Sequence, residues 1–177
     1  INKNLIVIGV FMNLKNASNP LVAVMMGSKT DWPSMKNASE ILSEFNVSHE
    51  VKVLSAHRTP GQLINYVKDI EEKNFKVIIA GAGGAAHLAG VIAAHTLIPV
   101  LGVPMKSSSL DGLDSLLSTV QMPSGIPVAT FGIGNAGASN AALMAVSILS
   151  LDSHDLKNKL IKFRENKAKS VLESELT

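Results

Sequence analysis

From residue 20 onward, short apolar runs alternate along the chain with stretches of helical periodicity. The Leu21–Met25 run is apolar throughout, which is typical of a strand covered on both faces, whereas His49–Leu54 alternates between apolar and polar residues. The apolar runs predict five β-strands, at Leu21–Met25, His49–Leu54, Val77–Ala80, Val100–Gly102 and Pro127–Thr130.

Apolar residues recur every three or four positions between these runs, and that spacing predicts helices. The helices are expected at Asp31 to Phe45, from Pro60 onward, at Ala85–His95, from about Asp111 to Val120, at Asn135–Leu151 and at Asp155–Leu172. Asp31 or Thr30 is expected to cap the first helix, and His154 the last. In the last helix the residues expected to face inward are Leu156, Leu160, Ile161 and Phe163.

Strand and helix alternate five times, which implies right-handed crossovers and a parallel sheet with helices on both faces. The predicted fold class is therefore α/β, a three-layer αβα, doubly wound parallel sheet in a single domain. A length of 177 residues suits one domain. We expect this domain to span residues 20–177. Residues 1–19 are expected to be an extension, partly disordered or non-native, with Met12 as the natural start.

The composition excludes several classes of function. The chain has no Cys, which rules out disulfides, thiolate metal sites and cysteine nucleophiles. With 16 basic and 14 acidic residues, and only 4% aromatic residues, it has no signature of a nucleic-acid partner. The apolar stretch from Leu5 to Met12 is far shorter than the roughly 20 residues that span a bilayer. We therefore expect a cytoplasmic protein with no nucleic acid or membrane partner.

In doubly wound sheets, ligands bind outside the carboxyl ends of the strands. Polar or glycine-rich groups follow four of the predicted strands. They are Gly27–Asp31, Ser55–Thr59, Gly81–His87 and Pro104–Leu110. We expect all four groups to face one rim of the sheet.

The first two groups carry residues suited to a phosphorylated ligand. Gly27–Thr30 lacks the spacing of a Walker phosphate loop, but its turn before a helix favours an anion. Asp31 is placed either to bond a ribose hydroxyl or to cap the helix. Arg58 offers a planar charged fork for phosphate or carboxylate, and His57 is the residue best suited to move a proton near neutral pH. Ser55 and His57 have no elbow motif or third acid beside them, which disfavours covalent catalysis.

Gly81–Ala86 fits the relaxed dinucleotide pattern G-x-G-x-x-G/A. It follows the third strand rather than the first, and no acidic residue follows Gly102, so NAD or FAD is disfavoured. Close approach of the backbone to a small ligand explains the glycines better. His87 is expected in the first turn of the next helix. His57 and His87 alone do not make a metal site, so no metal or cofactor is expected.

Together these segments resemble a known family. The motifs that carry the resemblance are MGSKTDW (Met26–Trp32), SAHRTP (Ser55–Pro60), IAGAGGAAHL (Ile79–Leu88), PVLGVP (Pro99–Pro104) and SLLSTVQMPSGIPVAT (Ser115–Thr130). They are similar to the class I N5-carboxyaminoimidazole ribonucleotide mutases of bacterial purine (IMP) biosynthesis. The resemblance runs from about Leu21 to the C-terminal helix.

The resemblance implies a flavodoxin-like fold, a homo-octamer and an isomerase that needs neither metal nor ATP. The substrate, N5-carboxyaminoimidazole ribonucleotide, would come from an ATP-dependent synthetase, and its carboxylate would move to C4. The implied roles are ribose and phosphoribosyl binding by Ser28 and Asp31, phosphate binding by Ser55 and Arg58, and acid/base catalysis by His57. The implied loop over the imidazole and the carboxylate contains Gly83, Gly84, Ala85 and His87, and Ser107 matches a substrate-loop position. The chain departs from the family pattern at Ala89, where Pro is usual, and at Lys106, where Gln is common.

Other interpretations remain open at this stage. A carboxylase using free carbon dioxide would share the fold and the site, and a flavin- or nucleotide-binding module or a purely structural oligomer would share the fold. The reaction also predicts a small, dry pocket, because carbon dioxide must not escape. The Asn135–Leu151 helix is apolar nearly all round, which fits either subunit packing or a central core helix.

Overall fold

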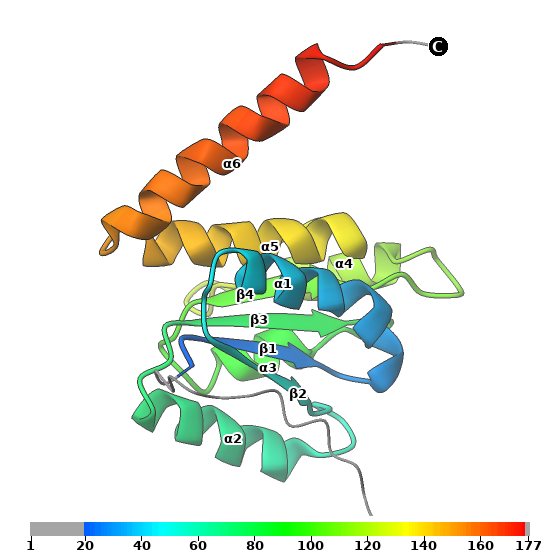
Figure 1. Ribbon diagram of the computed structural model, residues 1–177. Coiled ribbons are helices and arrows are strands. Elements are labelled where there is room, and N and C mark those ends of the chain that lie inside the picture. Colours follow the sequence, from blue (N-terminus) through cyan, green and yellow to red (C-terminus); the bar gives the residue numbers. More distant parts are fainter. Residues whose placement is uncertain (1–19, 176–177) are drawn as a thin grey trace, which may run out of the picture.

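The structure is a computed structural model, and it describes residues 20–175. Five parallel strands form one sheet in the order β2-β1-β3-β4-β5 (Figure 1). The strands are β1 (Val22–Met26), β2 (His49–Val53), β3 (Val77–Ala82), β4 (Val100–Pro104) and β5 (Ala129–Thr130). All five predicted strands are confirmed, with small shifts at their ends. The extension expected at residues 1–19 lies outside the described residues.

The strand order makes the sheet doubly wound. From β1 the chain crosses to β2 on one side, then returns past β1 to β3 and continues outward to β4 and β5. β1 therefore pairs with both β2 and β3, at the point where the winding reverses. The crevice outside the carboxyl ends of the strands at such a point is where ligands bind in this class of sheet.

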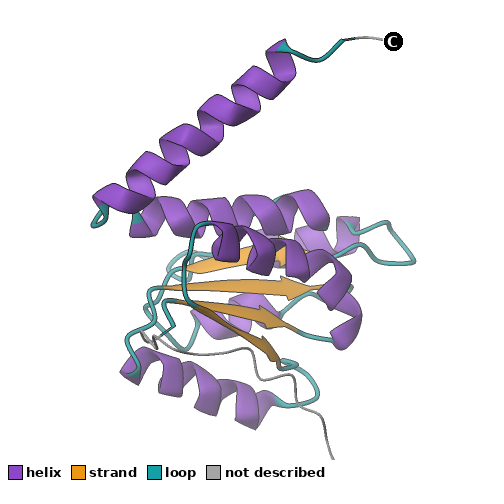
Figure 2. Cartoon of the chain, in the orientation of Figure 1, coloured by secondary structure: helices purple, strands orange, loops and turns teal. Residues whose placement is uncertain are grey.

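Helices cover both faces of the sheet (Figure 2). The helices are α1 (Trp32–Glu44), α2 (Pro60–Glu72), α3 (Leu88–Ala93), α4 (Leu113–Val120), α5 (Asn135–Leu149) and α6 (His154–Leu172). One buried cluster joins α1 and α5 to one face, and a second joins α2 and α3 to the other. The three-layer αβα prediction is confirmed.

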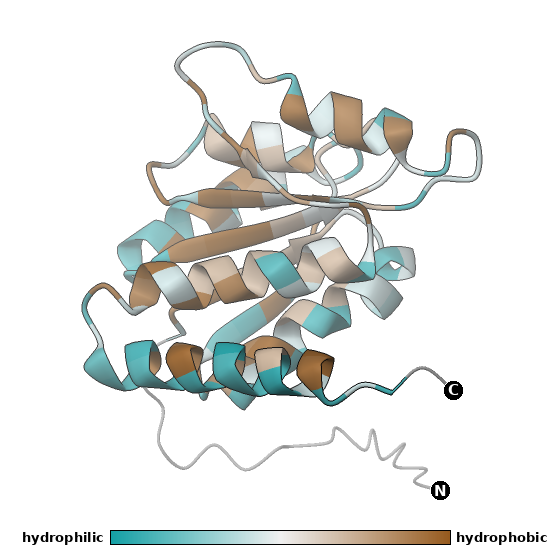
Figure 3. Ribbon diagram, turned by 90° about the horizontal axis from the view of Figure 1, so that it is seen from above, coloured by the Kyte–Doolittle hydropathy of each residue, from teal (hydrophilic) through white to brown (hydrophobic). Residues whose placement is uncertain are grey.

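Alternation along β1 explains the two clusters. Val22, Val24 and Met26 belong to the α1 and α5 side, whereas Ala23 and Met25 belong to the α2 and α3 side. Every residue of β1 is buried, as expected for a central strand. Figure 3 shows apolar, brown strand segments between the helices. β2 lies at the edge of the sheet, and its apolar residues Val51 and Val53 are 37% and 51% exposed.

α5 packs tightly against α1 through small side chains. Its buried residues include Ala138, Ala141, Ala142 and Ala145, while Met144 on the same helix is 44% exposed. Packing in the core and packing against another subunit therefore both remain explanations for its apolar surface, because one side of the helix is buried and another is exposed. No helix in the part of the chain from residue 20 to residue 175 is both long and apolar enough to cross a bilayer.

The predicted start of the third helix is wrong. α3 begins at Leu88, three residues later than expected, so His87 immediately precedes the helix instead of lying in its first turn. Gly84 has a φ of +67°, and the N–H groups of Gly84 and Ala86 donate to serine hydroxyls of α4. These partners, some 30 residues away, hold the segment in an open loop that local periodicity does not reveal.

The two predicted caps also need correction. Asp31 does occupy the N-cap position of α1, but its side chain makes no capping bond to that helix. Ser28 caps the short 3-10 helix Lys29–Asp31 that precedes α1, and its hydroxyl accepts the N–H of Thr30 at 3.3 Å. Asp31 instead reaches backward, and its Oδ2 accepts the N–H of Ser28 at 3.1 Å. At the last helix Ser153 is the cap, because its short hydroxyl reaches the N–H of Leu156, and His154 is the first helical residue.

α6 leaves the body of the domain at an angle to α5 (Figure 1). Leu160 is buried against α5, and Phe163 packs on Phe45 with ring centroids 5.6 Å apart. The expectation that Ile161 also faces inward is wrong, since its side chain is 49% exposed.

Candidate active site

A cavity of about 460 Å³ lies at the carboxyl ends of the strands, where the loops that follow β1, β2, β3 and β4 meet. Nine of the ten predicted site residues line it. They are Ser28, Asp31, Ser55, His57, Arg58, Gly83, Gly84, Ala85 and Ser107. The tenth, His87, is reached through a contact with His57. The sheet thus brings all four predicted loop groups to one rim.

Arg58 ties together the loops that follow β1 and β2. Its Nη2 donates to the carbonyl oxygen of Gly27 at 2.8 Å, and its Nε donates to Ser55 Oγ at 3.3 Å. The backbone N–H of Arg58 also donates to Ser55 Oγ, at 3.2 Å. These bonds orient the guanidinium beside the Gly27–Ser28 turn, so that its remaining N–H groups are available to an anion.

Asp31 lies half-buried next to this cation. Burial raises the pKa of its carboxyl, while the bond from the N–H of Ser28 and the charge of Arg58 act in the opposite direction. The backward bond to Ser28 uses Oδ2, and an ionised carboxylate accepts several bonds, so acceptor capacity remains for a hydroxyl. The two roles considered for Asp31, capping and hydroxyl binding, are therefore compatible in one side chain.

His57 and His87 form a hydrogen-bonded pair of imidazoles. Nε2 of His57 lies 2.9 Å from Nδ1 of His87, and the rings meet edge-on at 86°. His57 comes from the loop after β2 and His87 from the loop after β3. Both rings are exposed, so a proton on either one can exchange with a ligand or with solvent.

Two serines of α4 hold the glycine loop, and sequence reasoning gave them no role. Ser115 Oγ accepts the N–H of Gly84 at 2.8 Å, and Ser118 Oγ accepts the N–H of Ala86 at 3.0 Å. Ser115 is fully buried. The signal available in the sequence was their i, i+3 spacing, which puts both hydroxyls on one face of a helix.

Ser107 organises the loop that follows β4. Its hydroxyl donates to Asp114 Oδ1 at 2.6 Å and accepts the N–H of Gly112 at 3.1 Å. This bond from Ser107 lowers the pKa of Asp114. Next to it, Lys106 Nζ lies 3.1 Å from Asp111 Oδ1 on the surface. The hydroxyl of Ser107, the predicted substrate-loop residue, is therefore bonded to the loop and to the first turn of α4, and Ser107 forms part of the cavity wall.

A single chain leaves this cavity open. His57 and Arg58 are both exposed, so the small, dry pocket expected for the chemistry is not closed by one copy. Residues 20–175 contain no group of three or more His, Asp or Glu side chains placed to hold a metal ion. The residues at this rim offer a cationic fork and a pair of imidazoles.

Comparison with known proteins identifies the family of this chain. The family model described as AIR carboxylase matches residues 21–170. The N5-carboxyaminoimidazole ribonucleotide mutase of Bacillus subtilis is 57% identical over 155 residues, covering 88% of this chain and 96% of the relative. That of Escherichia coli K12 is 53% identical over 162 residues, covering 91% of this chain and 96% of the relative.

A solved structure has the same fold. The crystal structure of PurE from Treponema denticola superposes with a TM-score of 0.80 at 28% sequence identity, covering 88% of this chain and 96% of that one. On these grounds the chain belongs to the AIR carboxylase family, and the relatives it resembles at more than half of their positions are N5-carboxyaminoimidazole ribonucleotide mutases.

Proposed function

We propose that this protein is an isomerase that converts N5-carboxyaminoimidazole ribonucleotide into 4-carboxyaminoimidazole ribonucleotide in purine biosynthesis, with His57 as the proton carrier. The observation that carries the assignment of roles is the His57–His87 pair beside a cavity lined by Arg58 and the glycine loop. The family membership supports the reaction itself.

The phosphoribosyl end of the substrate is assigned to the loops after β1 and β2. Arg58 supplies a guanidinium already oriented by Gly27 and Ser55, and Ser28 lines the same cavity. Asp31 accepts a ribose hydroxyl with the capacity that its bond to Ser28 leaves. Binding energy from this remote end positions the imidazole ring for the chemistry.

The chemical step needs one proton carrier. The N–carboxylate bond of the substrate breaks and releases carbon dioxide, while the nitrogen takes a proton from His57. The electron-rich ring then attacks the carbon dioxide through C4, and His57 removes the C4 proton, which restores its starting state. Acid–base help of this kind is worth ~10²–10⁴-fold in rate. His87, bonded to His57, positions the ring and selects which nitrogen carries hydrogen.

The glycine loop forms the wall around the reacting atoms. Gly83, Gly84 and Ala85 line the cavity with little side-chain bulk, so that ring and carbon dioxide can lie close to the backbone. Ser107 closes the other side by shaping the loop after β4.

The reaction is tested by assaying two substrates without ATP. The purified protein is given either the N5-carboxylated ribonucleotide or aminoimidazole ribonucleotide with bicarbonate, and formation of the 4-carboxylated product is followed. Turnover of the first substrate alone is expected. Turnover of only the second would make the protein a carboxylase instead, and a bound visible chromophore with no turnover would favour a flavin-binding module.

We further propose that the working form is a homo-octamer. The outer face of α4 and the turn before it carry apolar residues that the single chain leaves about half exposed, namely Leu113, Leu117 and Val120 on the helix and Leu110 in the turn. Burial of these residues and closure of the open cavity both call for neighbouring subunits. Sedimentation of the purified protein tests the proposal, and a stable monomer or dimer that retains full activity would contradict it.

The cytoplasm is the proposed location, because it is the compartment of nucleotide synthesis that the reaction serves. Cell fractionation followed by immunodetection tests this, with a soluble-fraction signal expected.

A further inference from the structure

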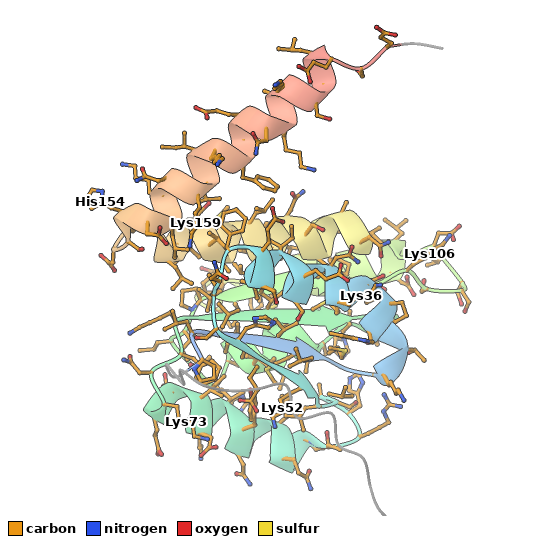
Figure 4. All side chains as sticks on the ribbon, in the orientation of Figure 1. Lys36, Lys52, Lys73, Lys106, His154 and Lys159 are labelled. Carbon is orange, nitrogen blue, oxygen red and sulfur yellow. The ribbon has the colours of Figure 1, made fainter. Side chains whose placement is uncertain are left out.

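Lys106 lies at the end of the cavity opposite to Arg58. Of the Lys and Arg side chains in residues 20–175, those that line the cavity are Arg58 and Lys106. Arg58 follows β2 and Lys106 follows β4, and the sheet order puts three strand spacings between them, roughly 14 Å. The loop that carries Lys106 projects beyond the ends of the strands (Figure 4). The cavity therefore has one cation at each end.

The counter-ion of Lys106 belongs to the same loop. Asp111 Oδ1 lies 3.1 Å from Lys106 Nζ, with 74% of the lysine and 84% of the aspartate side chain exposed. Exposed ion pairs of this kind contribute little to stability and separate readily. Lys106 lines the cavity and Asp111 does not, so the lysine borders the cavity while its ion-pair partner lies outside it.

The loop does not depend on this ion pair for its shape. Ser107 Oγ accepts the N–H groups of Leu110 and Gly112 and donates to Asp114, which fixes the backbone on both sides of Asp111. The Lys106 side chain can therefore leave Asp111 while the loop backbone stays in place.

We infer that Lys106 exchanges Asp111 for the carboxylate of the substrate and so determines preference for carboxylated over uncarboxylated ribonucleotides. This inference rests on the proposed function, in which Arg58 takes the phosphate. A ligand with an anion at each end matches a cavity with a cation at each end. An ammonium group, as a compact charge with three donors, suits a carboxylate that changes its attachment from nitrogen to carbon during the reaction.

The test measures two dissociation constants by calorimetry, for 4-carboxyaminoimidazole ribonucleotide and for aminoimidazole ribonucleotide, which lacks the carboxylate. Lys106→Gln is expected to weaken binding of the carboxylated ligand by about tenfold and to change the other by less than about twofold, as loss of one charge-assisted bond predicts. Lys36→Gln, which removes the same charge from the exposed face of α1, is the matched control and should leave both constants unchanged.

Asp111→Asn removes the negative charge that pairs with Lys106 and leaves the lysine unchanged. Asn tolerates the positive φ of 50° at this position, so the turn is preserved. This variant should bind the carboxylated ligand as tightly as the wild type or more tightly, because Lys106 is released.

Three results would overturn the inference: no loss for Lys106→Gln, an equal loss for both ligands, or a similar loss for Asp111→Asn. If the wild type bound neither ribonucleotide, the proposed function itself would fail, and the inference with it.

Discussion

Nε2 of His57 and Nδ1 of His87 lie 2.9 Å apart, although the two residues are separated by 30 positions in the chain. A hydrogen bond between two imidazoles needs one N–H and one lone pair, so the proton state of one ring constrains the other. If both facing nitrogens carried hydrogen, the contact would be repulsive. The pair therefore gives His57 a defined orientation and a partner for its proton, which is what a reversible proton carrier requires.

Replacing His57 by Asn removes the proton carrier and keeps a side chain of similar polarity. We expect His57→Asn to lose interconversion almost completely, by ~10²-fold or more, while nucleotide binding remains. Turnover is measured by product formation and binding by calorimetry. Wild-type turnover in this variant would remove His57 from the mechanism.

His87 is expected to act by positioning His57. His87→Leu removes the hydrogen-bond partner and should lower kcat by ~10²-fold with little change in KM, because misplacement of a reacting group costs about that much. His87→Asn supplies polar atoms near the position of Nδ1 and should recover part of the loss. Equal damage by Leu and Asn would mean that His87 has a role beyond the contact with His57.

Arg58→Ala should weaken binding of phosphate-bearing ligands by an order of magnitude or more, since a charge-assisted bond is lost. Arg58→Lys keeps the charge but not the fork that also bonds Gly27 and Ser55, and it should recover only part of the affinity. Competition with inorganic phosphate reports on the same site. An unchanged dissociation constant in Arg58→Ala would contradict the assignment of the phosphate end.

The hydroxyls of Ser115 and Ser118 should matter for both stability and activity. A double change of Ser115 and Ser118 to Ala leaves the N–H groups of Gly84 and Ala86 without their partners, and each lost partner costs ~1–3 kcal/mol. Denaturant unfolding should show the lower stability, and kcat should fall because the glycine loop loses its shape. Ser147→Ala on α5, far from the loop, serves as the control. Unaltered stability would mean that water or a changed loop conformation replaces these bonds.

Asp31 carries a stability penalty that depends on pH. Burial raises the pKa of its carboxyl above the ordinary value of 3.8, so ionised Asp31 disfavours the folded state at neutral pH. Below its unfolded pKa the carboxyl is protonated in both states and the penalty is absent, and it appears as pH rises through the folded pKa. Asp31→Asn keeps an acceptor for the N–H of Ser28 and should therefore be more stable than the wild type at pH 7.

Thermal unfolding of the two proteins between pH 3 and pH 7 tests this prediction. The advantage of Asp31→Asn should shrink as pH falls toward 3.8 and then disappear. The same variant should bind ribonucleotide less tightly at pH 7, because a charged acceptor for the ribose is lost. A variant less stable than the wild type at pH 7 would mean that the attraction to Arg58 outweighs burial.

Periodicity located nearly every element because each strand or helix carries its own pattern. The apolar Leu21–Met25 run and the spaced residues after Pro60 were sufficient to place β1 and α2 to within one residue at their starts. The predicted start of α3 was wrong because it depends on residues far along the chain. Hydroxyls of α4 bond the N–H groups of Gly84 and Ala86 and hold this segment outside the helix. The motifs predict Ser28 as a ligand-binding residue, but they do not predict that it caps the 3-10 helix Lys29–Asp31.

Short segments of the sequence encode the alternation of strands and helices, the polar groups after four strands and the family motifs. The contacts between His57 and His87, between Arg58 and Gly27, and between α4 and the glycine loop arise only in the folded chain. Each of these contacts joins segments about 30 residues apart. Their proximity follows from the order β2-β1-β3-β4, which local spacing does not specify, because it depends on how whole strands pair across the sheet.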